Sequence, residues 1–283
     1  MFGARLDGRT LSTGGNVSIG VPAQTRSFNA ITGSAGALYK VTEPVALVVN
    51  VASGFRAPSA PDLFANGFHE GTRAFERGNP DLDVERSLNV DAGVRLTSHD
   101  MTGEVTAFVN RVSDYIYLRP FGTSGSAFDS LQVVQGNARL VGLEGRLAWR
   151  PVSLLTLQMS GDYVRGQNTT ADVPLTFIPP LRIIYGAKVH GESLRGVVQP
   201  YVTANFETNW KQTRTDPRDF APPGYTVSSL GAGAGRVLPR GLMTVDLSVK
   251  NVFDAHYRSF MSRYKEYALA PGRVVTLRIT TPL

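Results

Sequence analysis

The sequence has 283 residues, of which 18% are charged and 42% are hydrophobic, and it contains no cysteine. The lack of cysteine excludes thiolate metal sites and cysteine nucleophiles, and it fits an extracytoplasmic protein without disulfides. The net charge of +6 comes from scattered lysines and arginines rather than from a run of like charges. We therefore expect no nucleic-acid partner.

Membrane helices and a leader are also not expected. No apolar run reaches the roughly 18 residues that a spanning helix needs. The longest, Val45 to Val49, is interrupted by Asn50. The first ten residues, MFGARLDGRT, lack the apolar region of a signal peptide.

Apolar and polar residues alternate along most of the chain, and this period of two predicts an all-β protein. The pattern is clearest where Leu88, Val90 and Ala92 share one face while Asn89 and Asp91 share the other. We expect about twelve strands, near residues 1–9, 29–41, 45–54, 88–97, 104–117, 141–150, 155–162, 180–189, 195–210, 225–237, 243–249 and 275–283.

The connections between these strands alternate in length. Tight turns are expected near residues 42–44, 98–100, 151–152, 190–192 and 238–241, and long polar loops are expected at the other strand ends. Antiparallel strands of about ten residues with short turns at one end and long loops at the other are typical of a transmembrane β-barrel. A two-sheet sandwich with one solvated face is the alternative, because its strands show the same alternation.

The longest of the expected loops runs from Gly54 to Glu85 and is rich in Gly, Pro and Asn. It contains the adjacent pair His69 and Glu70. Loops of this length in an ordered protein are usually functional or disordered. We therefore expect recognition to be the task of this loop.

Short motifs in a fixed order give the chain a family resemblance. They are Phe55-Arg56-Ala57-Pro58, Gly78-Asn79-Pro80-Asp81-Leu82 with Glu85, Asp114-Tyr115-Ile116-Tyr117, Asn137-Ala138-Arg139 with Gly142 and Glu144, Asn251-Val252-Phe253-Asp254 with Tyr257, and Pro271-Gly272-Arg273. With these motifs, the chain resembles the C-terminal half of the barrel of a TonB-dependent outer-membrane receptor.

The resemblance implies an organisation for residues 1–283. They would form the C-terminal portion of the barrel, with about 12 of about 22 strands present and no plug domain. The tight turns would be periplasmic and the long loops extracellular. The chain would lie in the bacterial outer membrane, in contact with outer-membrane lipid, and the TonB complex would act through the missing plug.

The resemblance also suggests ligands. Haem receptors of the family carry a histidine between motifs like Phe55-Arg56-Ala57-Pro58 and Asn79-Pro80-Asp81-Leu82, and His69 lies there. Zinc receptors place His and acidic residues in their loops, whereas siderophore receptors favour Arg and aromatic residues. We therefore expect a ferric siderophore, haem or metal ion, with these three left open. The candidate ligand-binding residues are His69, Glu70, Arg73, Arg56 and Tyr264, and the candidate metal ligands are His69 and His256.

Three of the candidates also have a structural interpretation. Arg56, at a strand end, can instead pair with carboxylates of the barrel wall, since arginine commonly makes such bidentate contacts. His256 can be an ordinary solvated loop residue, and so can His69. The sequence alone does not separate these roles.

Catalysis is not expected, because no catalytic triad, paired-carboxylate motif or nucleotide-binding fingerprint is present. No cofactor is expected either. The predicted function is that of an outer-membrane receptor for TonB-dependent uptake of an iron complex or another metal chelate. The alternatives are a stand-alone 12-stranded outer-membrane pore and an outer-membrane barrel enzyme.

Overall fold

A computed structural model describes residues 1–70, 74–121, 130–215 and 219–282. Its main feature is one antiparallel sheet in which chain neighbours pair in succession. The strands of this path are β1 (Phe2–Thr13), β2 (Gln24–Lys40), β3 (Val45–Arg56), β6 (Glu85–Thr97), β7 (Met101–Pro120), β8 (Ser130–Val152), β9 (Leu155–Asn168), β11 (Arg182–His190), β12 (Val197–Asn209), β13 (Tyr225–Leu238), β14 (Gly241–Lys250) and β15 (Val274–Thr280). The all-β prediction and the expected twelve strands are confirmed for the described residues.

The expected irregular loop after Gly54 has more structure than predicted. It holds α1 (Ala60–Phe64), β4 (Asn66–His69) and β5 (Ala74–Arg77), and β5 pairs in parallel with β8. The short elements elsewhere are a 3-10 turn (Val17–Ile19) and β10 (Val173–Pro174). Elements of two to five residues are too short to show a period, so the sequence did not reveal them. None of the described helices has the length and apolar character needed to cross a membrane.

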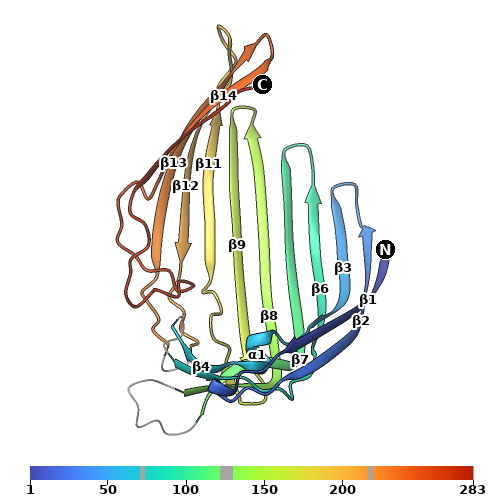
Figure 1. Ribbon diagram of the computed structural model, residues 1–283. Helices are drawn as coiled ribbons and strands as arrows, with labels where there is room; N and C mark the ends of the chain where they lie inside the picture. Colours follow the sequence, from blue (N-terminus) through green and yellow to red (C-terminus); the bar gives the residue numbers. More distant parts are fainter. Residues whose placement is uncertain (71–73, 122–129, 216–218, 283) are drawn as a thin grey trace.

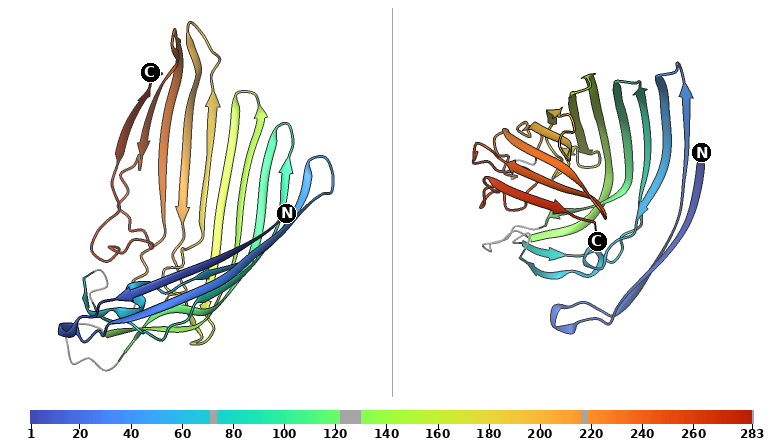
Figure 2. Two further views of the ribbon diagram at one scale, coloured as in Figure 1. Left: turned by 45° about the vertical axis from the view of Figure 1, so that its right-hand side comes forward. Right: turned by 90° about the horizontal axis from the view of Figure 1, so that it is seen from above.

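The strand ends are sorted as the sequence predicted. All five tight turns, from β2–β3 to β13–β14, lie at one end of the sheet, and α1, β4 and the long connections lie at the other (Figure 1). The sheet curves about an open side, with β1 and β15 at its two edges (Figure 2). In the described residues no pairing joins these two edge strands. The end of the sheet at which the long connections lie is called the loop end below.

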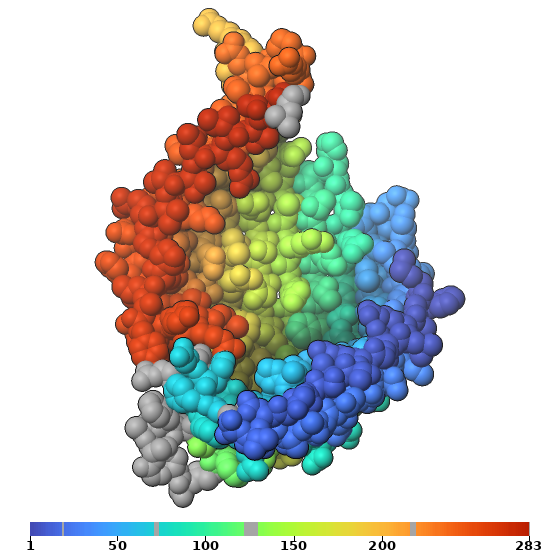
Figure 3. All heavy atoms as spheres, viewed as in Figure 1, coloured from blue at the N-terminus to red at the C-terminus, as the bar shows by residue number. Residues whose placement is uncertain are grey.

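The two faces of the sheet differ in chemistry. The convex face is apolar and exposed, as in the row Val90, Val109 and Val141, which are cross-strand partners on β6, β7 and β8. The concave face, which Figure 3 shows between the red and blue edges, carries charged side chains such as Arg95, Glu104 and Arg146. There the carboxylate of Glu104 accepts hydrogen bonds from Arg146 at 2.9 Å and Arg95 at 3.4 Å. Apolar-out and polar-in is the pattern of a membrane barrel wall, and it excludes the sandwich alternative.

Buried apolar residues gather mainly at the loop end. Leu63 of α1 and Leu82 are almost completely buried, and they pack with Phe28 of β2 and Ile116 of β7. The β1–β2 hairpin leans across this region (Figure 2). From it, Arg26 donates to the carbonyls of Pro80 and Leu82, the latter at 2.9 Å. The loop end is thus held by a small hydrophobic core of its own.

Candidate functional site

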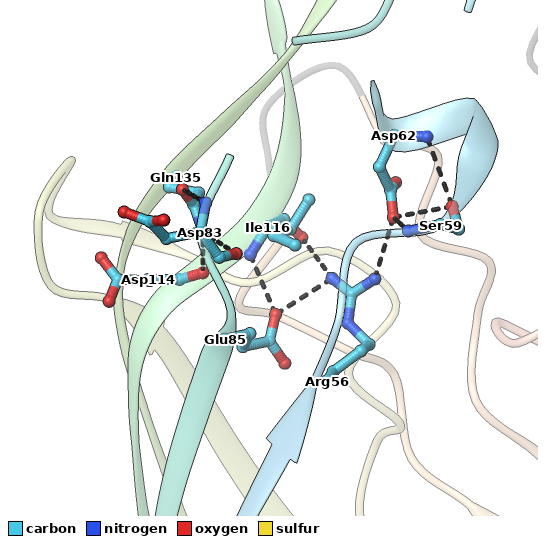
Figure 4. A network of polar contacts seen from close by, with 8 residues as sticks. All are labelled: Arg56, Ser59, Asp62, Asp83, Glu85, Asp114, Ile116 and Gln135. Atoms are coloured by element: carbon cyan, nitrogen blue, oxygen red, sulfur yellow. Dashed lines mark hydrogen bonds and ion pairs between the residues drawn. The ribbon is translucent and has the colours of Figure 1, made fainter. Parts of the chain in front are cut away.

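The Arg56 guanidinium at the end of β3 joins three segments (Figure 4). It donates to Asp62 of α1 at 3.2 Å, to Glu85 at the start of β6 at 3.0 Å, and to the backbone carbonyl of Ile116 at 3.3 Å. Glu85 in turn accepts from the backbone N–H of Ile116 at 2.9 Å. Charge-assisted hydrogen bonds of this kind fix geometry strongly. The structural interpretation of Arg56 therefore has direct support, while its contact with a ligand remains a prediction.

The other motifs complete the same scaffold. The side chain of Gln135 on β8 accepts from the N–H of Asp83 and donates to the carbonyls of Asp83 and Asp114, each at 2.9 Å (Figure 4). Asp114 has a positive φ of 55° at a β-bulge, which turns the end of β7. Ser59 and Asp62 form a capping box that starts α1. Residues of the motifs that carry the family resemblance therefore make contacts between the strand ends and the loop.

Gly78 shows why this region needs glycine. Its N–H donates to the carbonyl of Ala65 at 2.7 Å, so its backbone lies directly on the end of α1. A Cβ at this position would lie 2.7 Å from backbone atoms of Leu63 and Phe64. Because real Cβ contacts are not that short, any other residue would push α1 away.

The first group of predicted site residues lies on the β4–β5 hairpin. The imidazole Nδ1 of His69 lies 3.4 Å from Oε1 of Glu76, and the exposed Glu70 follows in the turn. Arg73 lies outside the described residues. In the described part of the chain, no group of three His, Asp or Glu side chains is placed to hold a metal ion.

The second group lies on the connection between β14 and β15, residues 251–273. Its two ends are tied together. Asn251 donates to the carbonyl of Ala255 at 2.9 Å, and the carboxylate of Asp254 accepts from the N–H of Arg273 at 2.8 Å. Both residues have positive φ, which asparagine and aspartate tolerate better than most. The Asn251 and Pro271 motifs thus form the neck of this loop.

Beyond the neck the loop displays aromatic and basic side chains. Tyr264 and His256 are both exposed, but they are on a different loop from His69. Tyr257 packs against Tyr225 of β13 with the rings tilted by 34° and their centroids 4.2 Å apart. Burial raises the pKa of the Tyr257 hydroxyl, and the charge of Glu207 raises this pKa further.

Lys265 ties this loop to its neighbours. Its side chain is 4% exposed, and its Nζ lies 2.6 Å from Oδ1 of Asp219 in the β12–β13 connection. The ammonium also lies 3.8 Å from the ring centroid of Phe260 and 5.0 Å from that of Phe177, in the β9–β11 connection. Three loops therefore meet at one buried cation. No sequence pattern indicates this contact, because Asp219 and Phe177 are 46 and 88 residues away in the chain.

A hollow of about 370 Å³ lies under this loop, at the loop end of β9, β11, β12 and β13. Arg182 and Asp162 form its floor, with Arg182 donating to Oδ1 of Asp162 at 2.7 and 2.9 Å. Arg258 and Tyr225 contribute to its walls. We did not predict these residues as a site, although the alternating pattern placed Asp162 on the polar face. The lining combines two cations, two acids and several aromatic rings: Arg182, Arg258, Asp162, Glu207, Trp210, Tyr225 and Phe260.

One curved sheet with an apolar outer face, a charged inner face, tight turns at one end and long connections at the other defines a wall segment of a membrane β-barrel. Residues 1–252 match the model of the TonB dependent receptor-like β-barrel family. The chain therefore belongs to this family, whose barrels lie in the outer membrane of bacteria, and it is an outer-membrane protein.

Solved structures show the same fold. The chain superposes on the copper transporter OprC with a TM-score of 0.81 at 20% identity, covering 98% of this chain and 44% of that one. A variant of the FrpB iron transporter from Neisseria meningitidis superposes with a TM-score of 0.69 at 15% identity, covering 98% of this chain and 42% of that one. BauA, the ferric preacinetobactin receptor from Acinetobacter baumannii, superposes with a TM-score of 0.68 at 16% identity, covering 98% of this chain and 40% of that one. The chain thus spans less than half the length of these proteins.

Proposed function

We propose that the chain is the part of an outer-membrane receptor that captures a metal chelate, and that uptake is driven by the TonB complex. Family membership supports the receptor class. The names of the similar structures, which include a copper transporter, an iron transporter and a ferric siderophore receptor, support a metal-containing cargo. The mechanism is binding and passage rather than bond chemistry, so we propose no enzymatic activity.

The observation that carries the ligand class is the composition of residues 251–273. This loop has five aromatic residues and four cations against two acids. Phe253, Tyr264 and Tyr267 are more than 60% exposed. Exposed aromatic rings and guanidinium groups suit an anionic, partly aromatic ferric chelate, through stacking and charge. We therefore favour an anionic siderophore complex over a bare metal ion.

Haem is the second candidate, and His69 is the observation that favours it. The imidazole is exposed on the β4–β5 hairpin, where it can approach an iron atom. The nearby Glu76 carboxylate, with Oε1 3.4 Å from Nδ1, can orient the ring toward a metal.

Binding by the full-length protein separates these ligands. With a ferric tris-catecholate as the probe, we expect Tyr264→Ala to weaken binding about tenfold, since one aromatic contact is lost. His256→Ala, on the same loop, and His69→Ala should leave that affinity unchanged. Intrinsic fluorescence quenching measures the dissociation constants. The siderophore proposal would be wrong if the parent protein did not bind the catecholate. If, in addition, the parent bound haem and His69→Ala did not, haem would be the ligand.

A further inference from the structure

Four outward-facing arginines lie next to one another on four consecutive strands. They are Arg86 on β6, Arg111 on β7, Arg139 on β8 and Arg165 on β9, and all four are exposed. We call them the arginine row. Arg111 and Arg139 are direct cross-strand partners. The other two are diagonal neighbours, because Arg86 pairs with Ser113 and Arg165 with Val141. Such positions place the Cβ atoms about 5 to 8 Å apart.

The arginine row continues the apolar outer face. Arg111 pairs with Leu88 and follows Val109 along the same face of β7, and both of these apolar side chains are exposed. On β9, Arg165 likewise follows Tyr163. The guanidinium groups therefore lie on the surface that contacts lipid, and not in the barrel interior.

In the described part of the chain, no ion pair joins the arginine row to an acidic residue. Among the described residues, none of the four side chains makes a hydrogen bond or an ion pair with another residue. Five of the six acidic residues of these strands lie on the inward face, namely Glu85, Asp91, Glu104, Glu144 and Asp162, and the sixth, Asp114, is exposed at the β-bulge of β7. Two like charges directly opposite each other, as in Arg111 and Arg139, destabilise a sheet unless an anion lies between them.

The height of the row matches that of lipid headgroups. Arg111 lies ten residues after Met101, the first residue of β7, and Arg165 lies ten residues after Leu155, the first of β9. At a rise of about 3.3 Å per residue and a tilt of about 45°, ten residues climb roughly 23 Å along the membrane normal. The apolar band of an outer-membrane barrel is about 25 Å tall. The row therefore lies at the border of the band on the loop side.

We propose that the arginine row binds the phosphate groups of the phosphorylated glycolipid of the outer leaflet, that is, lipid A. Guanidinium groups bind phosphate oxygens in a bidentate way, and two phosphates on one headgroup match two or more neighbouring arginines. The exposed apolar side chains on the turn side of the row, such as Val109 and Leu143, give the acyl chains of the same lipid a surface. This proposal rests on the outer-membrane location and not on the identity of the transported ligand.

Lipid binding by the full-length protein in detergent tests the assignment. The probe is lipid A with two phosphates, compared with the same lipid after removal of its phosphates, and native mass spectrometry measures the bound fraction. We expect R111Q/R139Q to weaken binding of the phosphorylated lipid by about tenfold or more, since charged hydrogen bonds are lost. R111K/R139K keeps the charge and should retain part of the affinity.

Arg236 of β13 is the matched control. It is exposed and outward-facing, but it lies near the turn end, where it pairs with Met243. R236Q should bind lipid A like the parent, and heat-modifiable migration on gels should show that every variant is folded. Equal lipid A affinity in the parent and a folded R111Q/R139Q overturns the proposal. So does equal binding of the dephosphorylated lipid, an equal loss in R236Q, or inorganic phosphate that competes as strongly as the lipid.

Discussion

Replacing Leu82 with alanine is expected to cost about 2 to 5 kcal/mol of local stability at the loop end. Leu82 is 1% exposed and packs in the cluster that contains Leu63, Val84 and Phe28. The cavity left by the smaller side chain would be closed only by moving α1, whose position also depends on the Arg56 network. We therefore expect the whole segment from Ala57 to Val84 to open more often.

Hydrogen exchange in the full-length protein measures this effect. Backbone amides of the segment should exchange faster in Leu82→Ala, while those in the middle of β6 and β7 should not change. Leu269→Ala, at an exposed leucine of the β14–β15 loop, is the matched control and should change little. Unaltered exchange in the Leu82 variant would show that the loop is held by something other than this cluster.

Replacing Lys265 with alanine is expected to separate three loops. The ammonium is buried beside Asp219, Phe260 and Phe177, so its removal leaves the Asp219 carboxylate in a largely enclosed site without its partner. Removing one member of a buried ion pair typically costs about 3 to 5 kcal/mol. We expect the β12–β13 and β14–β15 loops to become more mobile and ligand affinity to fall with them.

Limited proteolysis of the folded receptor follows this change, with faster cleavage expected within residues 211–220 and 255–268. Arg263→Ala serves as the control, because Arg263 contacts Phe177 in the same region but is exposed. A Lys265→Met, Asp219→Leu double variant removes both charges together and should regain much of the lost protection. Cleavage of Lys265→Ala at the parental rate would mean that the ion pair does not hold the loops.

The strands of the barrel wall were predictable because the pattern that defines each strand lies within a short stretch of the sequence. In a segment such as Leu88 to Leu96, a period of two fixes both the strand and its two faces, and the tight turns fix the antiparallel order. Strand ends were less accurate. β2 begins at Gln24 and β8 at Ser130, earlier than the pattern indicated, since apolar and polar residues do not alternate regularly in these first parts of the strands.

The site was predictable only in part, because its contacts are distant in the chain. The motifs around Arg56, Asn79 and Asn251 were recognised, but their contacts with other segments show that they shape the loops. No sequence pattern indicated that Lys265 pairs with Asp219. The pairing of Arg182 with Asp162 depends on strand register. The ligand role of His69 and Glu70 stays a prediction, as does that of Tyr264.

Uptake of a radiolabelled ferric siderophore by cells that make the full-length protein tests the central claim most directly. The measurement compares cells with an intact TonB complex with cells that lack it, and Tyr264→Ala serves as the binding-impaired variant. We predict accumulation that requires both TonB and the receptor and that falls in the variant at low ligand concentration. Accumulation that is equal without TonB, together with ion conductance in planar bilayers, would show a passive pore and contradict the account.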